Sequence, residues 1–300
     1  ELADTAASIT IVSRDSLDGE SNGVSVEPSF SADGTQIVFT SLASNLIDKD
    51  SNDSSDIFIK DLISGGVTLV SQRADGVQGN SASSEAAFSA DGTKVVFTSN
   101  ASNLVDADTN DVSDIFVKDL KDNSIIRIST NQDGTDAFGS SSGASFSADG
   151  TKVLFQSAAD NLLDGDTNRV TDIFIKDILT GEVIRINVSK DGEQADAASF
   201  NAKFSADSSK VIFESDASNL VAGDTNGQRD IFVVDLVTKE ILRVSEAADG
   251  TATNGASSYG SFSADGKRVV FESDASNLLD NDNNDSRDIF IKDLDTGEVI

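Results

Sequence analysis

The chain repeats itself with a fixed period of 58 residues, and this period limits the folds that are open to it. The motif Phe-Ser-Ala-Asp marks each unit and begins at Phe30, Phe88, Phe146, Phe204 and Phe262. Two further columns recur in the same register: Phe39, Phe97, Phe155, Phe213 and Phe271, and Phe58, Phe116, Phe174, Phe232 and Phe290. A unit of this size cannot bury an apolar face by itself, so neighbouring units must stack. The chain is therefore a repeat protein of five units.

Each unit is expected to form four short β-strands. In the first unit, apolar and β-branched residues favour strands over residues 24–31, 35–41, 56–62 and 66–71. Asp33-Gly34 separates the first two and predicts a tight hairpin, because such turns need residues that tolerate positive φ. The fourth unit has Asp207-Ser208 at this place, and a looser turn is expected there. Four-stranded units of this kind are typical of propeller blades.

We therefore predict an all-β fold, a five-bladed β-propeller of four-stranded antiparallel blades, in one domain over residues 1–300. The blade cores are expected to start near residues 24, 82, 140, 198 and 256. Residues 9–13 align with residues 67–71, a fourth strand, and the chain reaches Ile300 as the fifth unit begins its own fourth strand. We expect the segment 8–13 to complete the last blade and close the ring, which removes exposed sheet edges. The alternative is a fragment of a larger ring.

A nine-residue acidic loop, Asp-x-Asp-x-Asn-x-x-x-Asp, separates the second and third strands. Oxygen side chains at positions 1, 3, 5 and 9 surround one point when the backbone curls, which suits Ca²⁺. The candidate ligands in the complete motifs are Asp48, Asp50, Asn52 and Asp56; Asp106, Asp108, Asn110 and Asp114; Asp164, Asp166, Asn168 and Asp172; and Asp280, Asp282, Asn284 and Asp288. The fourth unit keeps Asp224, Asn226 and Asp230 but has Ala222 at position 1, so its site is expected to be weak or empty.

Two explanations of these loops remain open. Carboxylates this close repel one another without a cation, which favours Ca²⁺ and predicts about four strong sites. The alternative is a set of Asx turns, in which the side chains bond their own backbone and no metal is present.

The chain resembles TolB-type bacterial β-propeller repeats. The resemblance lies in Phe30-Ser-Ala-Asp-Gly-Thr-Gln-Ile-Val-Phe39, in Asp56-Ile-Phe-Ile-Lys-Asp-Leu62 and in their copies, and it covers nearly the whole chain. Two departures are the alanine column at Ala32, where such units usually have proline, and the long acidic insert. The resemblance implies a propeller fold but no particular function, because propellers serve many functions.

The acidic loops also resemble the calcium loops of integrin α-chain propeller blades. That resemblance implies a further ligand, the backbone carbonyl at position 7, which is Ser54, Val112, Val170 or Ser286 in the complete motifs. The departure is position 6, where such loops favour glycine for a sharp turn; this chain has Asp53, Asp111, Arg169, Gly227 and Asp285.

Composition excludes several classes of function. Asp and Glu number 52 against 22 Lys and Arg, a formal net charge of −30, so the surface repels nucleic acid. The absence of Cys and His removes disulfides, the Ser-His-Asp triad and nearly all zinc sites. No apolar run reaches membrane-spanning length, so membrane insertion is not expected. We predict an extracellular or cell-surface location, as part of a longer bacterial polypeptide.

The predicted function is a non-enzymatic calcium-binding propeller that acts as a binding or structural module, with a protein or glycan as its ligand. One alternative is a glycosidase with carboxylates at the channel mouth. Two columns that differ between units suggest it: Glu27, Glu85, Gly143, Asn201 and Tyr259, and Thr40, Thr98, Gln156, Glu214 and Glu272. The other alternative is a calcium-dependent lectin. The absence of Trp and the single Tyr disfavour both, because little is left to stack on a sugar ring.

Overall fold

The computed structural model describes residues 9–106, 108–280 and 282–300. Within these residues the strands form five antiparallel sheets, four of them four-stranded and the last three-stranded. None of the described residues lies in a helix long and apolar enough to cross a membrane.

The first three blades contain the strands β1 to β12. Their bounds are Ser25–Phe30 (β1), Gln36–Ser41 (β2), Asp56–Asp61 (β3) and Val67–Leu69 (β4); Ser83–Phe88 (β5), Lys94–Ser99 (β6), Asp114–Asp119 (β7) and Ile125–Arg127 (β8); Ser141–Phe146 (β9), Lys152–Ser157 (β10), Asp172–Asp177 (β11) and Val183–Arg185 (β12). The last two blades contain Ser199–Phe204 (β13), Lys210–Ser215 (β14), Asp230–Asp235 (β15) and Ile241–Arg243 (β16), then Ser257–Phe262 (β17), Arg268–Ser273 (β18) and Asp288–Asp293 (β19).

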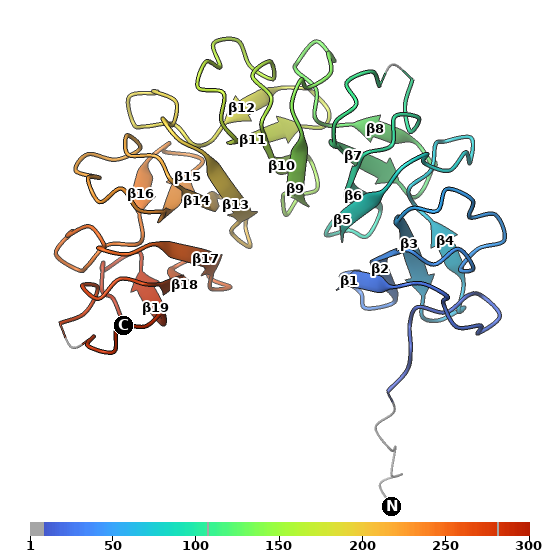
Figure 1. The fold of residues 1–300 in the computed structure, drawn as a ribbon, viewed down its shortest axis with the longest axis horizontal. Helices are drawn as coiled ribbons and strands as arrows, with labels where there is room; N and C mark the ends of the chain where they lie inside the picture. Colours follow the sequence, from blue (N-terminus) through green and yellow to red (C-terminus); the bar gives the residue numbers. More distant parts are fainter. Residues whose placement is uncertain (1–8, 107, 281) are drawn as a thin grey trace, which may run out of the picture.

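The sheets are the blades of a propeller. Each is a meander in chain order, such as β1-β2-β3-β4, and the blades lie side by side along an arc (Figure 1). Strands β1, β5, β9, β13 and β17 lie on the inner side of this arc (Figure 1). The prediction of an all-β fold with five antiparallel blades is confirmed.

Aliphatic and aromatic columns hold the blades together. Within blade 1 the rings of Phe39 and Phe58 lie 6.0 Å apart, and the other blades repeat this pair. Between blades 1 and 2, Ile57 and Ile59 share one core with Phe97. Burying one such side chain stabilises a fold by about 1.5–3 kcal/mol, so stacking of the blades supplies what a lone sheet lacks.

The Asp-Gly hairpins are present, but their loops are longer than a two-residue turn. The Ser31 N–H donates to the Gln36 carbonyl at 2.9 Å and so encloses residues 32–35, in which Gly34 has φ 70°. In blade 4, Ser208 takes the same left-handed conformation, at φ 56°, and donates to the Ser205 carbonyl at 2.8 Å. The expected looser turn was therefore wrong, because this serine accepts the backbone strain that glycine avoids.

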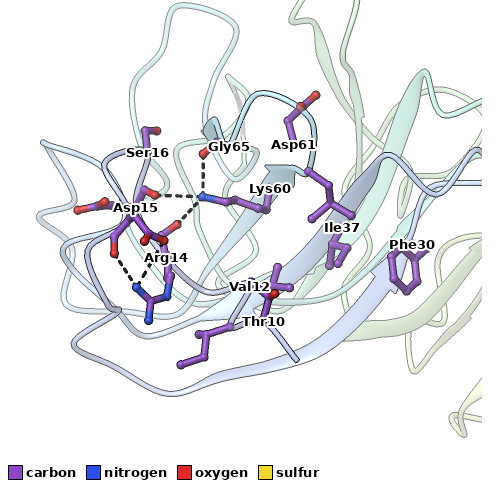
Figure 2. A pocket seen from close by; sticks show the side chains of 13 residues that line it. Thr10, Val12, Arg14, Asp15, Ser16, Phe30, Ile37, Lys60, Asp61 and Gly65 are labelled. Atoms are coloured by element: carbon purple, nitrogen blue, oxygen red, sulfur yellow. Dashed lines mark hydrogen bonds and ion pairs between the residues drawn. The ribbon is translucent and has the colours of Figure 1, made fainter. Parts of the chain in front are cut away.

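The predicted closing strand lies against blade 1 instead of blade 5. Residue 8 is outside the described residues, and in the part that follows Val12 packs on Ile37. Figure 2 shows the ammonium of Lys60 between the backbone carbonyls of Arg14 and Asp15, to which it donates at 3.1 and 3.0 Å. These contacts hold the segment on the first blade.

The edge of β19 is taken by the end of the chain. Ile291 and Ile300 exchange two backbone hydrogen bonds of 2.8 and 2.9 Å. Blades 1 and 5 stand apart, and the arc is open (Figure 1). The prediction that residues 8–13 close the ring was wrong: the repeat register makes them equivalent to a fourth strand, but the neighbour they pack on is the following blade.

Candidate functional site: the acidic loops and the inner rim

The acidic loops bring positions 3 and 9 together below the surface. Position 9 is the first residue of the third strand in each blade, and Asp56, Asp114, Asp172 and Asp230 are fully buried there. The backbone before it folds inward, so the position-3 side chains of blades 2 to 4 are also buried. Buried carboxylates need a partner of opposite charge.

An arginine lies beside these carboxylates in three blades, and in blades 2 and 3 it contacts both of them. In blade 2, Arg127 Nη1 is 3.0 Å from Asp108 Oδ1 and 3.5 Å from Asp114 Oδ2, and its side chain is 6% exposed. Arg185 makes the same contacts with Asp166 and Asp172, and Arg243 lies 3.3 Å from Asp224. Each arginine is the last residue of the short fourth strand, which runs beside the third. A guanidinium therefore stands where a metal ion was expected.

Blade 1 differs because Leu69 stands at the place of these arginines. There the Gln78 side-chain amide donates to Asp50 Oδ1 and to Asp56 Oδ2, both at 2.8 Å. The two carboxylates of blade 1 have hydrogen-bond donors but no guanidinium between them.

The position-5 asparagines form Asx turns. In blade 2, the Val112 N–H donates to Asn110 Oδ1 at 3.2 Å, and Asn110 Nδ2 donates to Asp114 Oδ2 at 3.0 Å. The same pair of bonds recurs around Asn52, Asn168, Asn226 and Asn284. Position 6 is left-handed in every blade, with φ of 52° at Asp53, 54° at Asp111, 58° at Arg169, 61° at Gly227 and 51° at Asp285.

The structure does not bring the full predicted ligand sets together. The position-1 side chains are on the exposed side of the loop, namely Asp48, Asp106, Asp164 and Asp280. Asp106 pairs instead with Arg73 at 2.9 Å. Among the described residues, no three acidic, His or Cys side chains are grouped so as to hold a metal. The arginines of blades 2 to 4 do not fit a metal there, and calcium binding itself stays a prediction.

Burial dominates the electrostatics of the loops. It raises the pKa of Asp56 and Asp114, although hydrogen bonds from Ser71 and Ser129 oppose the shift. Burial also raises the pKa of Asp108, Asp166 and Asp224, and the positive charge of the neighbouring arginine works against it. The guanidinium therefore favours the ionised form of Asp108, Asp166 and Asp224 and opposes the effect of burial.

The two variable columns of the inner rim tie each blade to the next. A bulge in every inner strand places one residue at positive φ, such as Glu85 at 56°. The Glu85 N–H donates to Glu27 Oε2 at 2.9 Å, and the Gly143 N–H donates to Glu85 Oε2 at 2.9 Å. These two glutamates are held by blade contacts, and this arrangement does not give the paired free acids of a glycosidase.

In the later blades the acceptor comes from the second column. Gln156 Oε1 accepts from the Asn201 N–H at 3.1 Å, and Glu214 Oε1 accepts from the Tyr259 N–H at 2.9 Å. Where the first column has Glu the second has Thr, and where the first has Gly or Asn the second has Gln or Glu. The difference between blades is therefore a change of the side chain that accepts one structural hydrogen bond from the bulge N–H.

Blades 4 and 5 carry a cluster that the other blades lack. The guanidinium of Arg229 lies 4.7 Å from the ring centre of Phe200, and its Nη1 is 3.8 Å from Glu214. The only tyrosine, Tyr259, is bonded to the same Glu214 and is 65% exposed. In blade 5, Arg287 lies 3.6 Å from Glu272. This aromatic and charged cluster is the main departure from repeat symmetry on the inner rim.

Comparisons with solved structures show the fold. The structure of TolB from Agrobacterium tumefaciens, described as putative, is 17% identical, with 93% of this chain and 80% of that one covered and a TM-score of 0.52. The propeller domain of the Trilobed protease from Pyrococcus furiosus, described as having an open velcro topology, is 15% identical over 93% of this chain and 71% of that one, with a TM-score of 0.56. An oligogalacturonate lyase in complex with manganese is 16% identical over 91% and 63%, with a TM-score of 0.57. No family model matches the chain, and no characterised protein matches it in sequence.

These comparisons confirm the propeller resemblance and correct the predicted function. Similar folds also occur in prolyl endopeptidase and acylaminoacyl peptidase, of which the chain spans 35% and 38% of the length. These solved structures include peptidases and a lyase, and in three loops of this chain the cation is an arginine. The predicted function, a non-enzymatic binding or structural module, was wrong, whereas calcium binding by the loops stays a separate prediction.

The sequence analysis missed the arginines that neutralise the loops. Their signal is a column, Arg127, Arg185 and Arg243, that recurs at the end of the fourth strand. An arginine repeated on an otherwise apolar strand next to buried aspartates is a sign of a buried ion pair.

Proposed function

We propose that the chain is the propeller domain of a longer peptide-processing enzyme, whose inner rim binds a positively charged stretch of polypeptide. The observation that carries the proposal is the cluster of Phe200, Arg229, Glu214 and Tyr259 on blades 4 and 5, because it breaks the repeat where a ligand can reach it. The peptidases among the similar structures support the class of protein. In this proposal the catalytic groups belong to another part of the polypeptide.

Charge favours a cationic ligand. Near the bulges of the inner strands, the carboxylates of Glu27, Glu85, Glu214, Asp216, Glu272 and Asp274 outnumber the cationic side chains of Lys203, Arg229 and Arg287. Arg229 and Arg287 are already paired with Asp216 and Asp274, at 2.8 Å each. The exposed ring of Tyr259 offers a face to an ammonium or guanidinium group, an attraction of about 0.5–2 kcal/mol.

The fluorescence of Tyr259 tests the proposal, because the chain has one Tyr and no Trp. Pentalysine is titrated into the protein at low salt, with pentaglutamate as the reference peptide. We expect a saturable change with pentalysine alone, a binding constant reduced several-fold by Glu272→Gln, and an unchanged one after Glu182→Gln on an exposed outer turn. Saturation by both peptides, or equal effects of both variants, would show that the inner rim is not the binding site.

A location outside the cytoplasm remains part of the proposal. The similarity to TolB supports it, and fractionation of cells that express the full-length protein tests it. Recovery of the protein with cytoplasmic markers contradicts this part.

A further inference from the structure

The four contacts between neighbouring blades are formed by equivalent residues of the repeat. The leading blade contributes three aliphatic side chains, which in blade 1 are Val38, Ile57 and Ile59. The following blade contributes a small residue from its inner strand together with a valine and a phenylalanine, which in blade 2 are Ala86, Val95 and Phe97. The corresponding columns form the cores between the later blades.

Blade 5 displays the leading half of this contact without a cover. Val270, Ile289 and Ile291 are 40%, 62% and 37% exposed. Their counterparts in blades 1 to 4 are at most 5% exposed. These three adjacent aliphatic side chains, whose counterparts are buried in every other blade, form an exposed apolar face of the kind that marks an interaction site.

A polar group marks the same edge. Glu214 of blade 4 accepts the bulge N–H of the following blade, and Glu272 is its counterpart in blade 5. The side chain of Glu272 is one-third exposed and lies 3.6 Å from Arg287. The carboxylate is thus at the place where a following blade presents a backbone N–H.

The column of small residues decides which occupant fits. A Cβ built on Gly260 would lie 2.6 Å from Ile212 of the leading blade, so this column has little room. Blades 2 to 4 have Ala86, Ala144 and Ala202 there, but blade 1 has Pro28. If a second copy of the chain covered blade 5, its Pro28 would meet the aliphatic side chains there. A blade with Ala or Gly at that place fits them better.

The geometry points to one further blade of the same repeat type as the partner of the blade-5 face. This blade contributes Ala or Gly, Val and Phe to the apolar contact, and its bulge N–H donates to Glu272. The interaction extends along the arc the contact that already joins the five blades. The two proposals share Glu272, whereas the apolar contact on β18 and β19 does not involve the ring of Tyr259.

A single cysteine can report whether this face is covered, because the chain has no Cys. The Ile289→Cys variant is compared with the same variant extended after Ile300 by a copy of residues 185–242, which continues the repeat in register. We expect the rate of alkylation to fall at least tenfold in the extended chain. An unchanged rate overturns the proposal, whether the added residues fold or not.

Two controls separate this partner from the alternatives. Ala202→Pro, made only in the added copy, gives it the residue of blade 1 and is expected to restore fast alkylation. The unextended chain is also alkylated over a hundredfold range of concentration, where the rate is expected to stay constant. If alkylation slows as the concentration rises, a second copy covers the face, and the proposed partner is wrong.

Discussion

At the scale of single residues, Arg127 neutralises carboxylates that are buried inside blade 2. It is buried together with Asp108 and Asp114 and lies against the partly buried Asp136, and it forms ion pairs with all three. A buried ion pair gains little over apolar residues, but removing one partner leaves an isolated charge in a medium that solvates it poorly. The arginine is therefore required because the carboxylates are present.

Arg127→Leu, which copies Leu69 of blade 1, is expected to lower the free energy of unfolding at pH 7 by about 3–5 kcal/mol. Burial already raises the pKa of Asp108 and Asp114, and loss of the positive charge raises both further. The folded variant then binds more protons than the unfolded chain. The difference in the free energy of unfolding between parent and variant therefore shrinks as the pH falls from 7 to 5. Urea unfolding at both pH values measures the effect, with Arg127→Leu combined with Asp114→Asn as the partial rescue. An equal deficit at both pH values contradicts this account.

At the scale of the blade, a lysine of the third strand joins four of the five blades to the connection before the blade. Lys118 Nζ donates to the Gln72 carbonyl at 2.9 Å, and Lys176 Nζ donates to the Thr130 carbonyl at 2.7 Å. Blade 4 has Val234 at this place. Burial lowers the pKa of both lysines to about 8.

Lys176→Val, which copies blade 4, is expected to change the pH dependence of stability. Below pH 8 the lysine is charged in both states, and its burial costs free energy. Between pH 8 and about 10.5 the folded state binds fewer protons than the unfolded one, so the stability of the parent rises with pH. Across this range the free energy of unfolding of the parent is expected to rise by about 1–3 kcal/mol relative to that of the variant. Arg127, the charge that acts on Lys176, is present in both proteins. An equal difference in the free energy of unfolding between parent and variant at pH 8 and at pH 10.5 contradicts the lowered pKa of Lys176.

The blades themselves follow from local rules, which is why they could be predicted. Alternation, Asp-Gly turns and the phenylalanine columns each act within about 30 residues, and the observed strands lie within two residues of the expected ones. The loop contacts could not be predicted in the same way. Asp114 and Arg127 meet because β7 and β8 are paired, and side-chain charge alone does not show that an ion pair is buried. The inner-rim bonds were missed because their acceptor moves from Glu85 to Gln156 between blades.

At the scale of the whole molecule, the formal net charge of −30 implies strong repulsion between surface carboxylates. Any added salt screens the repulsion between the surface carboxylates. The position of the first segment was not predictable, since the repeat register is the same whether residues 9–13 pack on the next blade or return to the last one. The choice depends on tertiary contacts such as those of Lys60.

The predicted calcium sites are tested by counting bound ions. Equilibrium dialysis against Ca²⁺ at constant ionic strength, with Mg²⁺ as the reference, gives the number of sites. Because of the arginines in blades 2 to 4, we expect fewer than four ions. Blade 1 has Leu69 in place of the arginine, and Leu69→Arg is expected to remove an ion from its loop. A count of zero in the parent, or no change in the variant, shows that these loops are Asx turns without a metal.

The arginines of blades 2 to 4 also decide how the protein depends on its surroundings. An ion taken from solution is lost when its concentration falls or a chelator competes for it. A guanidinium that is part of the polypeptide stays at full occupancy in fresh water, in chelator and after long dilution. Three of the five loops therefore carry their countercharge as a covalent part of the chain. The conformation of these loops does not depend on an ion taken from solution.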